Sequence, residues 1–127
     1  MVAVTGIFSG IAVKDIDEAR TFYRDILGLG VEDNAMGALN IALPQGGIVF
    51  VYPKGDHVPA TYTVLNLEVD DIDKAVDELA SKGVQFPVYD GTHQDEKGIA
   101  RGKSVNQGPD IAWFTDPSGN IFSVLEN

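Results

Sequence analysis

Few side chains in this 127-residue chain are candidates for catalysis or metal binding. It contains no cysteine, which excludes disulfides, thiolate metal sites and a cysteine nucleophile. One histidine, His57, lies beside Asp56 in a stretch that is typical of an exposed loop. The other, His93, belongs to the cluster Thr92-His93-Gln94-Asp95-Glu96, which could supply metal ligands. Consecutive loop residues rarely converge on one ion, so a solvated charged loop is the favoured interpretation of this cluster.

Two polar residues, Asn66 and Glu68, alternate with leucines in an apolar run. A buried Glu68 would have a raised pKa and could act as a general base, or as a counter-ion for a cationic ligand. We slightly favour the alternative that Glu68 ends its strand in solvent. Ser123 has no histidine in an identifiable pattern with it and is not a credible nucleophile. The glycines at 98 and 102 lack the spacing of a phosphate-binding loop.

The overall charge limits the classes of partner. Nineteen acidic residues against nine basic ones give a net charge of −10, which argues against nucleic acid and anionic membranes, because both are polyanions. It mildly favours a neutral or cationic ligand. No signal peptide and no apolar run of membrane-spanning length is recognisable, so a soluble cytoplasmic protein is the default expectation.

The chain repeats itself. Residues 13–19 match residues 69–75 at five of seven positions, an offset of 56 residues from Val13 to Val69. Later, residues 43–46 resemble residues 116–119, with their prolines 73 residues apart. The second half therefore carries 17 additional residues, which we expect within 89–108. We predict one domain over 1–127, with module 1 at about 1–53, a linker at 54–61 and module 2 at about 62–127.

Each half shows the pattern of a strand, a helix and three further strands. Asp15 with Glu18 forms a capping box that predicts a helix ending at Gly28, and Asp71 begins a second helix ending at Gly83. Strands are predicted over 4–13, 62–69, 110–115 and 120–126, and near 29–33, 37–43, 47–53 and 84–89. This predicts an α+β fold: two tandem βαβββ modules that form a curved eight-stranded mixed sheet around a trough, with helices on the outer face.

Alternation along the strands divides each strand into a helix-facing side and a side that lines the trough. An apolar trough with a few polar points is typical of a small-molecule site. The predicted ligand-binding residues are Phe8, Phe50, Tyr52, Tyr62, Val64, Asn66, Glu68, Trp113 and Ser123. For Phe8, Phe50 and Trp113, core packing is an equal alternative. The glycine-rich segment 89–108 is expected to be mobile, as a lid over one end of the trough or as a simple exposed loop.

The motifs resemble those of the vicinal oxygen chelate family, which includes glyoxalase I, extradiol dioxygenases and bleomycin- or fosfomycin-resistance proteins. The resemblance rests on Val13-x-Asp15, on residues 19–29 (Ala-x-x-Phe-Tyr-x-x-x-Leu-Gly-Leu) and on the Asp-Pro-x-Gly-Asn turn at 116–120, in order along nearly the whole chain. It implies a divalent metal held by His, Gln or Glu at four positions. Here those positions hold Phe8, Phe50, Val64 and Ser123, none of which is a good ligand. We therefore expect no metal and no cofactor.

Two functions remain open. The first is a metal-free binding protein, similar to the bleomycin-resistance members, that sequesters an aromatic or cationic compound such as an antibiotic. The second is a metalloenzyme of the family, a lyase, isomerase or dioxygenase, with unusual ligands from Glu68, His93, Asp95 or Glu96. A third interpretation makes the trough a protein interface. The resemblance also implies a homodimer, and it leaves open whether each trough is built within one chain or by module swapping.

Overall fold

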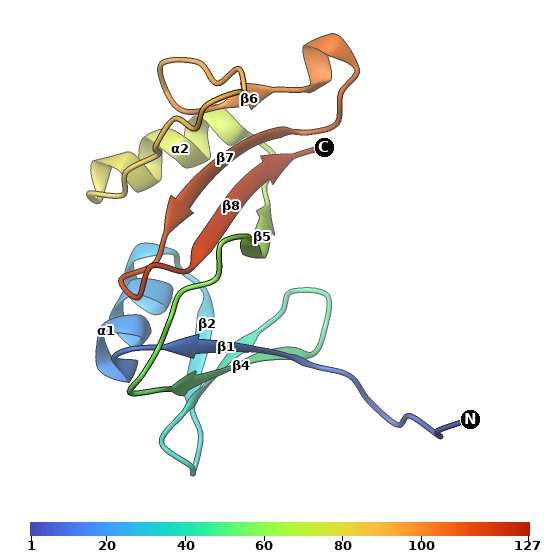
Figure 1. Ribbon diagram of the computed structural model, residues 1–127, viewed down its shortest axis with the longest axis vertical. Coiled ribbons are helices and arrows are strands. Elements are labelled where there is room, and N and C mark those ends of the chain that lie inside the picture. The colour runs from blue at the N-terminus through green and yellow to red at the C-terminus, as the bar shows by residue number, and fades with distance from the viewer. The chain divides into compact units, whose positions relative to one another are not determined.

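A computed structural model describes residues 1–127, which divide into two compact units, Met1–Pro59 and Ala60–Asn127. Each unit contains a four-stranded mixed sheet and helical segments, in the tandem order that the repeat predicts (Figure 1). The division between the units falls inside the stretch 54–61. No helix of the structure is both long enough and apolar enough to cross a membrane.

The first unit has the strand order β1-β4-β3-β2. Its strand β1 pairs with β4 in parallel, and the remaining pairs are antiparallel. The elements are β1 (Ser9–Val13), α1 (Ile16–Thr21), the π-helical turn η1 (Phe22–Ile26), β2 (Gly30–Asp33), β3 (Leu39–Ala42) and β4 (Ile48–Pro53).

Helix α1 begins at the predicted cap. The Glu18 N–H donates to Asp15 Oδ1 at 3.0 Å, which satisfies one of the free N–H groups at the start of the helix. At its other end the helix widens into η1, where the Leu27 N–H donates to the Phe22 carbonyl at 3.0 Å. Gly28 then takes a φ of +72°, a left-handed conformation that favours glycine, and the chain turns into β2.

The second unit has the order β5-β8-β7-β6, with β5 and β8 parallel. The elements are β5 (Thr63–Glu68), α2 (Ile72–Ser81), β6 (Ala100–Arg101), the 3₁₀ turn η2 (Lys103–Val105), β7 (Asp110–Thr115) and β8 (Ile121–Glu126). The Lys74 N–H donates to Asp71 Oδ1 at 3.0 Å, so the predicted cap of α2 is confirmed. The two modules thus share the same helix start.

Two strand predictions need correction. No strand forms over 84–89, and the fourth position in the second sheet is taken by the two-residue β6, inside the predicted insertion. The reason is that Pro87 has no N–H, while the Gln94 side chain binds the Pro87 carbonyl and the Tyr89 N–H in place of a neighbouring strand. The first strand begins at Ser9 rather than at residue 4, because its partner β4 begins only at Ile48.

The predicted helix-facing sides form the cores of the two units. In the first unit, Val13, Val49 and Val51 are at most 2% exposed. In the second, α2 buries Ile72, Val76 and Leu79, and the sheet buries Ala112, Phe114, Phe122 and Val124. The opposite side of each sheet carries the residues that the alternation along the strands assigns to the predicted binding surface.

Candidate ligand-binding groove

The open side of the second sheet carries two rows of side chains across its strands. Trp113 of β7 pairs with Ser123 of β8, which pairs with Asn66 of β5. The next row runs from Ile111 through Leu125 to Glu68. In the first row, the fully buried Ser123 hydroxyl donates to Asn66 Oδ1 at 2.6 Å. A polar pair therefore flanks the only tryptophan of the chain.

Trp113 forms one wall of a small cavity of about 200 Å³. The ring of Tyr89 stands edge-on to the indole, with centroids 6.1 Å apart and planes at 86°. Such edge-to-face packing matches the positive rim of one ring to the negative face of the other. The cavity is lined by Thr61, Tyr62, Thr63, Tyr89, Thr92, Trp113 and Ile121. It offers three aromatic rings with hydroxyl groups at its edge.

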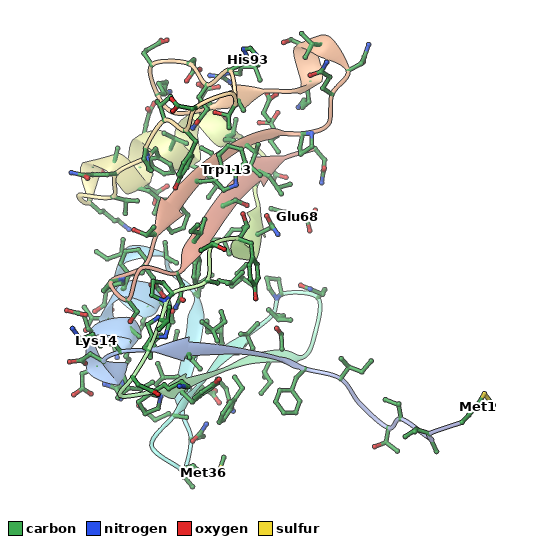
Figure 2. The ribbon with its side chains drawn as sticks, in the orientation of Figure 1. Met1, Lys14, Met36, Glu68, His93 and Trp113 are labelled. Carbon is green, nitrogen blue, oxygen red and sulfur yellow. The ribbon has the colours of Figure 1, made fainter.

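Trp113 and Thr92 also line a second cavity, of about 730 Å³, on the same unit. This cavity adds His93, Arg101, Ser104, Val105, Gln107 and Ile111 to the lining. Figure 2 shows Trp113 on the sheet and His93 on the loop beyond it. We call the two cavities together the Trp113 groove. The groove is mainly aromatic and aliphatic at the end near Tyr62 and more polar at the end near Arg101.

Gln94 holds the loop that forms one side of the groove. Its Nε2 donates to the carbonyls of Pro87, at 3.0 Å, and Gly98, at 2.6 Å. Its Oε1 accepts from the Tyr89 N–H at 2.7 Å and from the Thr92 hydroxyl at 2.5 Å. The Gln94 side-chain amide therefore forms hydrogen bonds with two carbonyls, one N–H and one hydroxyl between residues 87 and 98, and it positions the backbone of Tyr89 and the side chain of Thr92.

Two glycines let the same segment pack closely. Gly98 has a φ of +87°, and a Cβ at this position would lie 2.7 Å from the Phe86 carbonyl oxygen. At Gly102 an added Cβ would lie 2.6 Å from the carbonyl oxygen of Pro109. Ile99 between them is fully buried. Glycine at these two positions therefore allows the tight packing of the segment.

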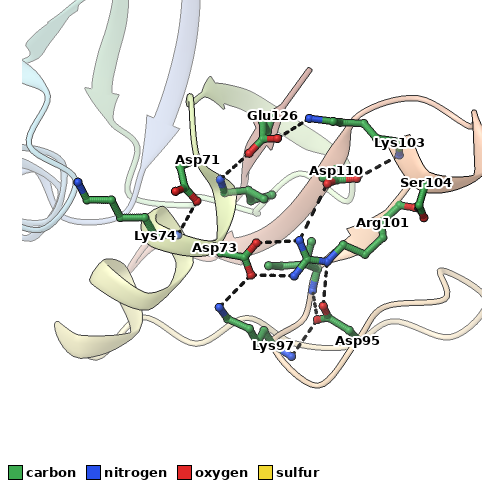
Figure 3. Close-up of polar contacts among 12 residues, drawn as sticks. Asp71, Asp73, Lys74, Asp95, Lys97, Arg101, Lys103, Ser104, Asp110 and Glu126 are labelled. Carbon is green, nitrogen blue, oxygen red and sulfur yellow. Dashed lines mark hydrogen bonds and ion pairs between the residues drawn. The ribbon is translucent and has the colours of Figure 1, made fainter.

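A network of ion pairs joins the segment to α2 (Figure 3). The Arg101 guanidinium binds both carboxylate oxygens of Asp73, at 2.8 and 2.9 Å, and Asp95 at 3.1 Å. Lys97 reaches Asp73 at 3.1 Å and Asp77 at 2.9 Å. The hydrogen bonds from Arg101, and then from Lys97, hold the pKa of Asp73 well below its usual range. Hydrogen bonding to Asp73 in turn raises the pKa of Arg101.

The carboxylate of Asp95 is occupied within this network. Burial alone would raise the pKa of Asp95, but the N–H groups of Ile99 and Lys97, each 2.9 Å from Oδ1, and then Arg101 lower it instead. His93, two residues before Asp95, is exposed with a φ of +53°. The favoured interpretation of residues 92–96 as a solvated charged loop therefore needs amendment at Asp95, which is a structural anchor.

Glu68 lies away from the Trp113 groove. It is exposed at the end of β5, where it accepts from Asn127 Nδ2 at 2.9 Å, as the solvated interpretation expects. It lines a polar cavity of about 430 Å³ together with Asp70, Lys103 and Glu126. Lys103, and then the Ile72 N–H, lower the pKa of Glu126. Glu126 thus connects β8 to the start of α2 and to the β6–β7 connection.

Three predicted site residues lie in the first unit. Phe8 stands edge-on to Phe50, with centroids 6.3 Å apart, and Tyr52 stacks on Phe50 at 5.9 Å. These rings lie on the side of the first sheet opposite its core. Of the predicted residues in the second unit, Tyr62 and Trp113 line the groove, Asn66 and Ser123 flank it, and Val64 is half-buried on β5.

The main residues that the sequence prediction missed are Tyr89, Thr92 and Arg101. The repeat places the insertion within Tyr89–Gly108. Because the first half of the chain has no corresponding segment, the repeat could not show how the insertion packs against the second unit.

The four positions where the family resemblance implies metal ligands do not fit a divalent ion. They hold two phenylalanines, a valine and a serine, and the Ser123 hydroxyl is already donated to Asn66. In the structure, no group of three or more His, Asp or Glu side chains could hold a metal ion. The arrangement of the Trp113 groove instead suits an apolar, planar molecule with hydrogen-bonding groups at its edge.

Comparisons with known proteins agree with this fold. Among solved structures, a superfamily member from Sphaerobacter thermophilus DSM 20745 is 24% identical, with a TM-score of 0.67 and coverage of 96% of this chain and 98% of that one. TnmS3, an antibiotic binding protein from Streptomyces sp. CB03234, is 22% identical, with a TM-score of 0.67 and coverage of 99% and 98%. The fosfomycin resistance protein FosX from Listeria monocytogenes is 13% identical, with a TM-score of 0.69 and coverage of 98% and 95%.

These identities show the shared fold alone. A search of curated proteins found no match. The model of one family matches residues 4–124, which is nearly the whole chain. The chain therefore belongs to the Glyoxalase/Bleomycin resistance protein/Dioxygenase superfamily.

Proposed function

We propose that this protein is a metal-free binding protein that holds a small aromatic compound in the Trp113 groove. The observation that carries the proposal is the convergence of Tyr62, Tyr89 and Trp113 on one cavity, where Gln94 accepts from the Tyr89 backbone N–H and the Tyr89 ring packs edge-on against Trp113. Aromatic rings that are fixed before binding lose little side-chain entropy when a ligand stacks on them.

The size of the cavity sets the affinity that this arrangement supports. Burying about 200 Å² of apolar ligand surface is worth roughly 5 kcal/mol before the costs of association are subtracted. Each well-formed ring contact adds about 0.5–1.5 kcal/mol. Three such contacts bring the gross gain to roughly 6.5–9.5 kcal/mol, from which association costs of at least about 4 kcal/mol are subtracted. A one-ring or two-ring ligand would therefore bind with submillimolar to millimolar affinity, and micromolar affinity needs a larger ligand that extends along the sheet into the neighbouring cavity.

The charges around the groove favour a neutral or cationic ligand. Arg101 is the one arginine or lysine side chain in the lining, and its charge is neutralised by Asp73 and Asp95. The net charge of −10 repels anions at longer range. The faces of the three rings attract cations through their quadrupoles.

The structural neighbours support sequestration of an antibiotic as one form of this function. TnmS3 is described as antibiotic binding and FosX as a fosfomycin resistance protein. Both share the fold at low sequence identity, so they support the class of function and do not identify the ligand.

The single tryptophan provides the test, because its fluorescence reports on the groove alone. The purified protein is titrated with planar aromatic compounds matched in size and differing in charge. We expect saturable quenching at submillimolar to millimolar concentration, with tighter binding of cationic and neutral members than of anionic ones. Calorimetry on Tyr89→Ala should show affinity about two- to tenfold lower, since a stacking ring worth about 0.5–1.5 kcal/mol is removed.

Val88→Ala is the matched control for this experiment. Val88 is the exposed neighbour of Tyr89 and lines neither cavity of the groove, so its variant should bind like the wild type. The absence of saturable binding to any member of the panel would overturn the proposal. Equal losses in the two variants would show that the loop as a whole, and not the Tyr89 ring, carries the effect.

A further inference from the structure

The side-chain amide of Asn66 is held in one orientation by Ser123. The hydroxyl of Ser123, which is fully buried, donates to Asn66 Oδ1 at 2.6 Å. A side-chain amide has an acceptor oxygen on one side and two N–H donors on the other. Because its oxygen is bound to Ser123, the Nδ2 group of Asn66 is directed away from that hydroxyl. Asn66 is exposed, so a ligand can reach these N–H donors.

Asn66 lies in the same row of side chains as Trp113. Trp113 pairs with Ser123 across the antiparallel strands β7 and β8, and Ser123 pairs with Asn66 across the parallel strands β8 and β5. Neighbouring strands are about 4.8 Å apart, so the backbones at Trp113 and Asn66, two strands apart, are separated by roughly 10 Å. A two-ring compound that stacks on the Trp113 indole is long enough to bring its edge to the Asn66 amide.

The charges beside this amide favour a neutral acceptor over an anionic one. Glu68 follows Asn66 on the same side of β5, about 7 Å further along the strand. It is exposed, and its one hydrogen bond is with the neutral Asn127 amide at 2.9 Å. A carboxylate on the ligand would be repelled by Glu68 and by the net charge of −10. A carbonyl oxygen carries no net charge and avoids this repulsion.

We propose that the ligand of the Trp113 groove is a neutral aromatic carbonyl compound, whose ring stacks on Trp113 and whose carbonyl oxygen accepts a hydrogen bond from Asn66 Nδ2. This inference rests on the proposed function and specifies the class of its ligand. Asn66 determines the specificity, and Ser123 acts through Asn66 as a positioning residue. A donor that is already oriented loses little entropy on binding. It is left without a partner when a ligand that lacks the oxygen covers it, which penalises hydrocarbons of the same shape.

Four two-ring probes test this preference. Indanone carries a carbonyl, indane has a methylene in its place, indoline has an N–H donor, and indane carboxylate is an anion. Binding is followed by NMR through the indole N–H signal of the single tryptophan. We expect indanone to bind about two- to tenfold more tightly than indane, the range that one hydrogen bond gives. Indoline and the carboxylate should bind no more tightly than indane. The side-chain amide signals of Asn66 should shift with indanone and not with indane.

Substitutions separate the role of the amide from the shape of the surface. Asn66→Ala should lose the preference for indanone over indane. Asn66→Asp replaces the N–H donors by an oxygen and should prefer indoline. Ser123→Ala leaves the amide free to rotate, so the preference should become smaller. Asn106→Gly is the control, because Asn106 is exposed, lines neither cavity of the groove and has a φ of +54° that glycine adopts freely. Circular dichroism establishes that the variants are folded.

The outcomes distinguish this inference from the proposed function. Saturable binding of indanone and indane with equal affinity would overturn the inference and leave the proposed function standing. A preference for indoline in the wild type would also overturn it, because Asn66 would then present its oxygen to the ligand. A preference for indanone that persists in Asn66→Ala would overturn the role of Asn66. Binding of none of the four probes would overturn the proposed function, and the inference with it.

Discussion

Replacing Gln94 by alanine tests whether one side chain holds the loop beside the Trp113 groove. The substitution removes four hydrogen bonds, each worth about 1 kcal/mol. Two of these bonds are exposed, and water can replace them at little cost. We therefore expect the free energy of unfolding to fall by about 1–2 kcal/mol, with a decrease in Tm of roughly 3–8 °C.

The assay is urea denaturation followed by Trp113 fluorescence and by far-UV circular dichroism. Gln85→Ala is the control, since Gln85 is exposed and its side chain makes no recorded hydrogen bond. Gln94→Glu keeps the acceptor for Tyr89 and Thr92 but places an oxygen against the carbonyls of Pro87 and Gly98. It should therefore destabilise at least as much as alanine at neutral pH. The reasoning fails if Gln94→Ala changes the unfolding free energy no more than Gln85→Ala does.

Three further predictions follow from the second unit. Gly98→Ala should lower the free energy of unfolding by about 1–3 kcal/mol in urea titrations, because Gly98 has a left-handed φ and the added Cβ would contact Phe86. Gly55→Ala is the control and should not lower it, because a Cβ at Gly55 meets nothing within 4 Å. The pKa of Asp73 is depressed in the folded state, so its ion pairs stabilise the protein fully above about pH 5, and this stabilisation is lost as the pH falls below about 4. Asp73→Asn should therefore flatten this part of a profile of unfolding free energy against pH. An unchanged slope in the variant would count against the network. The protein purified without chelators should contain far less than one equivalent of transition metal by elemental analysis, and one tightly bound equivalent that disappears on changing His93 or Glu68 would favour the metalloenzyme.

Local signals were sufficient to predict most of the fold. The aspartates Asp15 and Asp71 cap their helices through the same hydrogen bond, and both belong to the matching stretches 13–19 and 69–75 from which the repeat was aligned. The Asp-Pro-x-Gly-Asn turn is equally local, because Asp116 accepts from the N–H groups of Ser118 and Asn120 at 2.9 Å. Alternation then assigned most of the buried side of the strands correctly, but it placed the fully buried Ser123 on the binding side, and Leu65 and Leu67 of the helix-facing side are only half-buried.

The insertion could not be predicted in the same way, because its structure depends on long-range contacts. The apolar run at 84–89 has strand character, but a glutamine later in the chain takes its backbone groups. Arg101 meets Asp73 across 28 positions, and no spacing rule specifies such a pair. For the candidate site, Tyr62 and Trp113 could therefore be predicted from alternation, while Tyr89 and Thr92 depend on how the insertion folds back.

The reduction of β6 to Ala100–Arg101 has a consequence for how this protein can change over evolutionary time. A full-length strand constrains every second residue, because a substitution or a one-residue shift disturbs its neighbours along the whole ladder. The residues that precede β6 are instead held by a few separate side-chain hydrogen bonds, such as those of Gln94 and Asp95. Insertions and substitutions between those points can reshape the pocket wall while the rest of the sheet keeps its register.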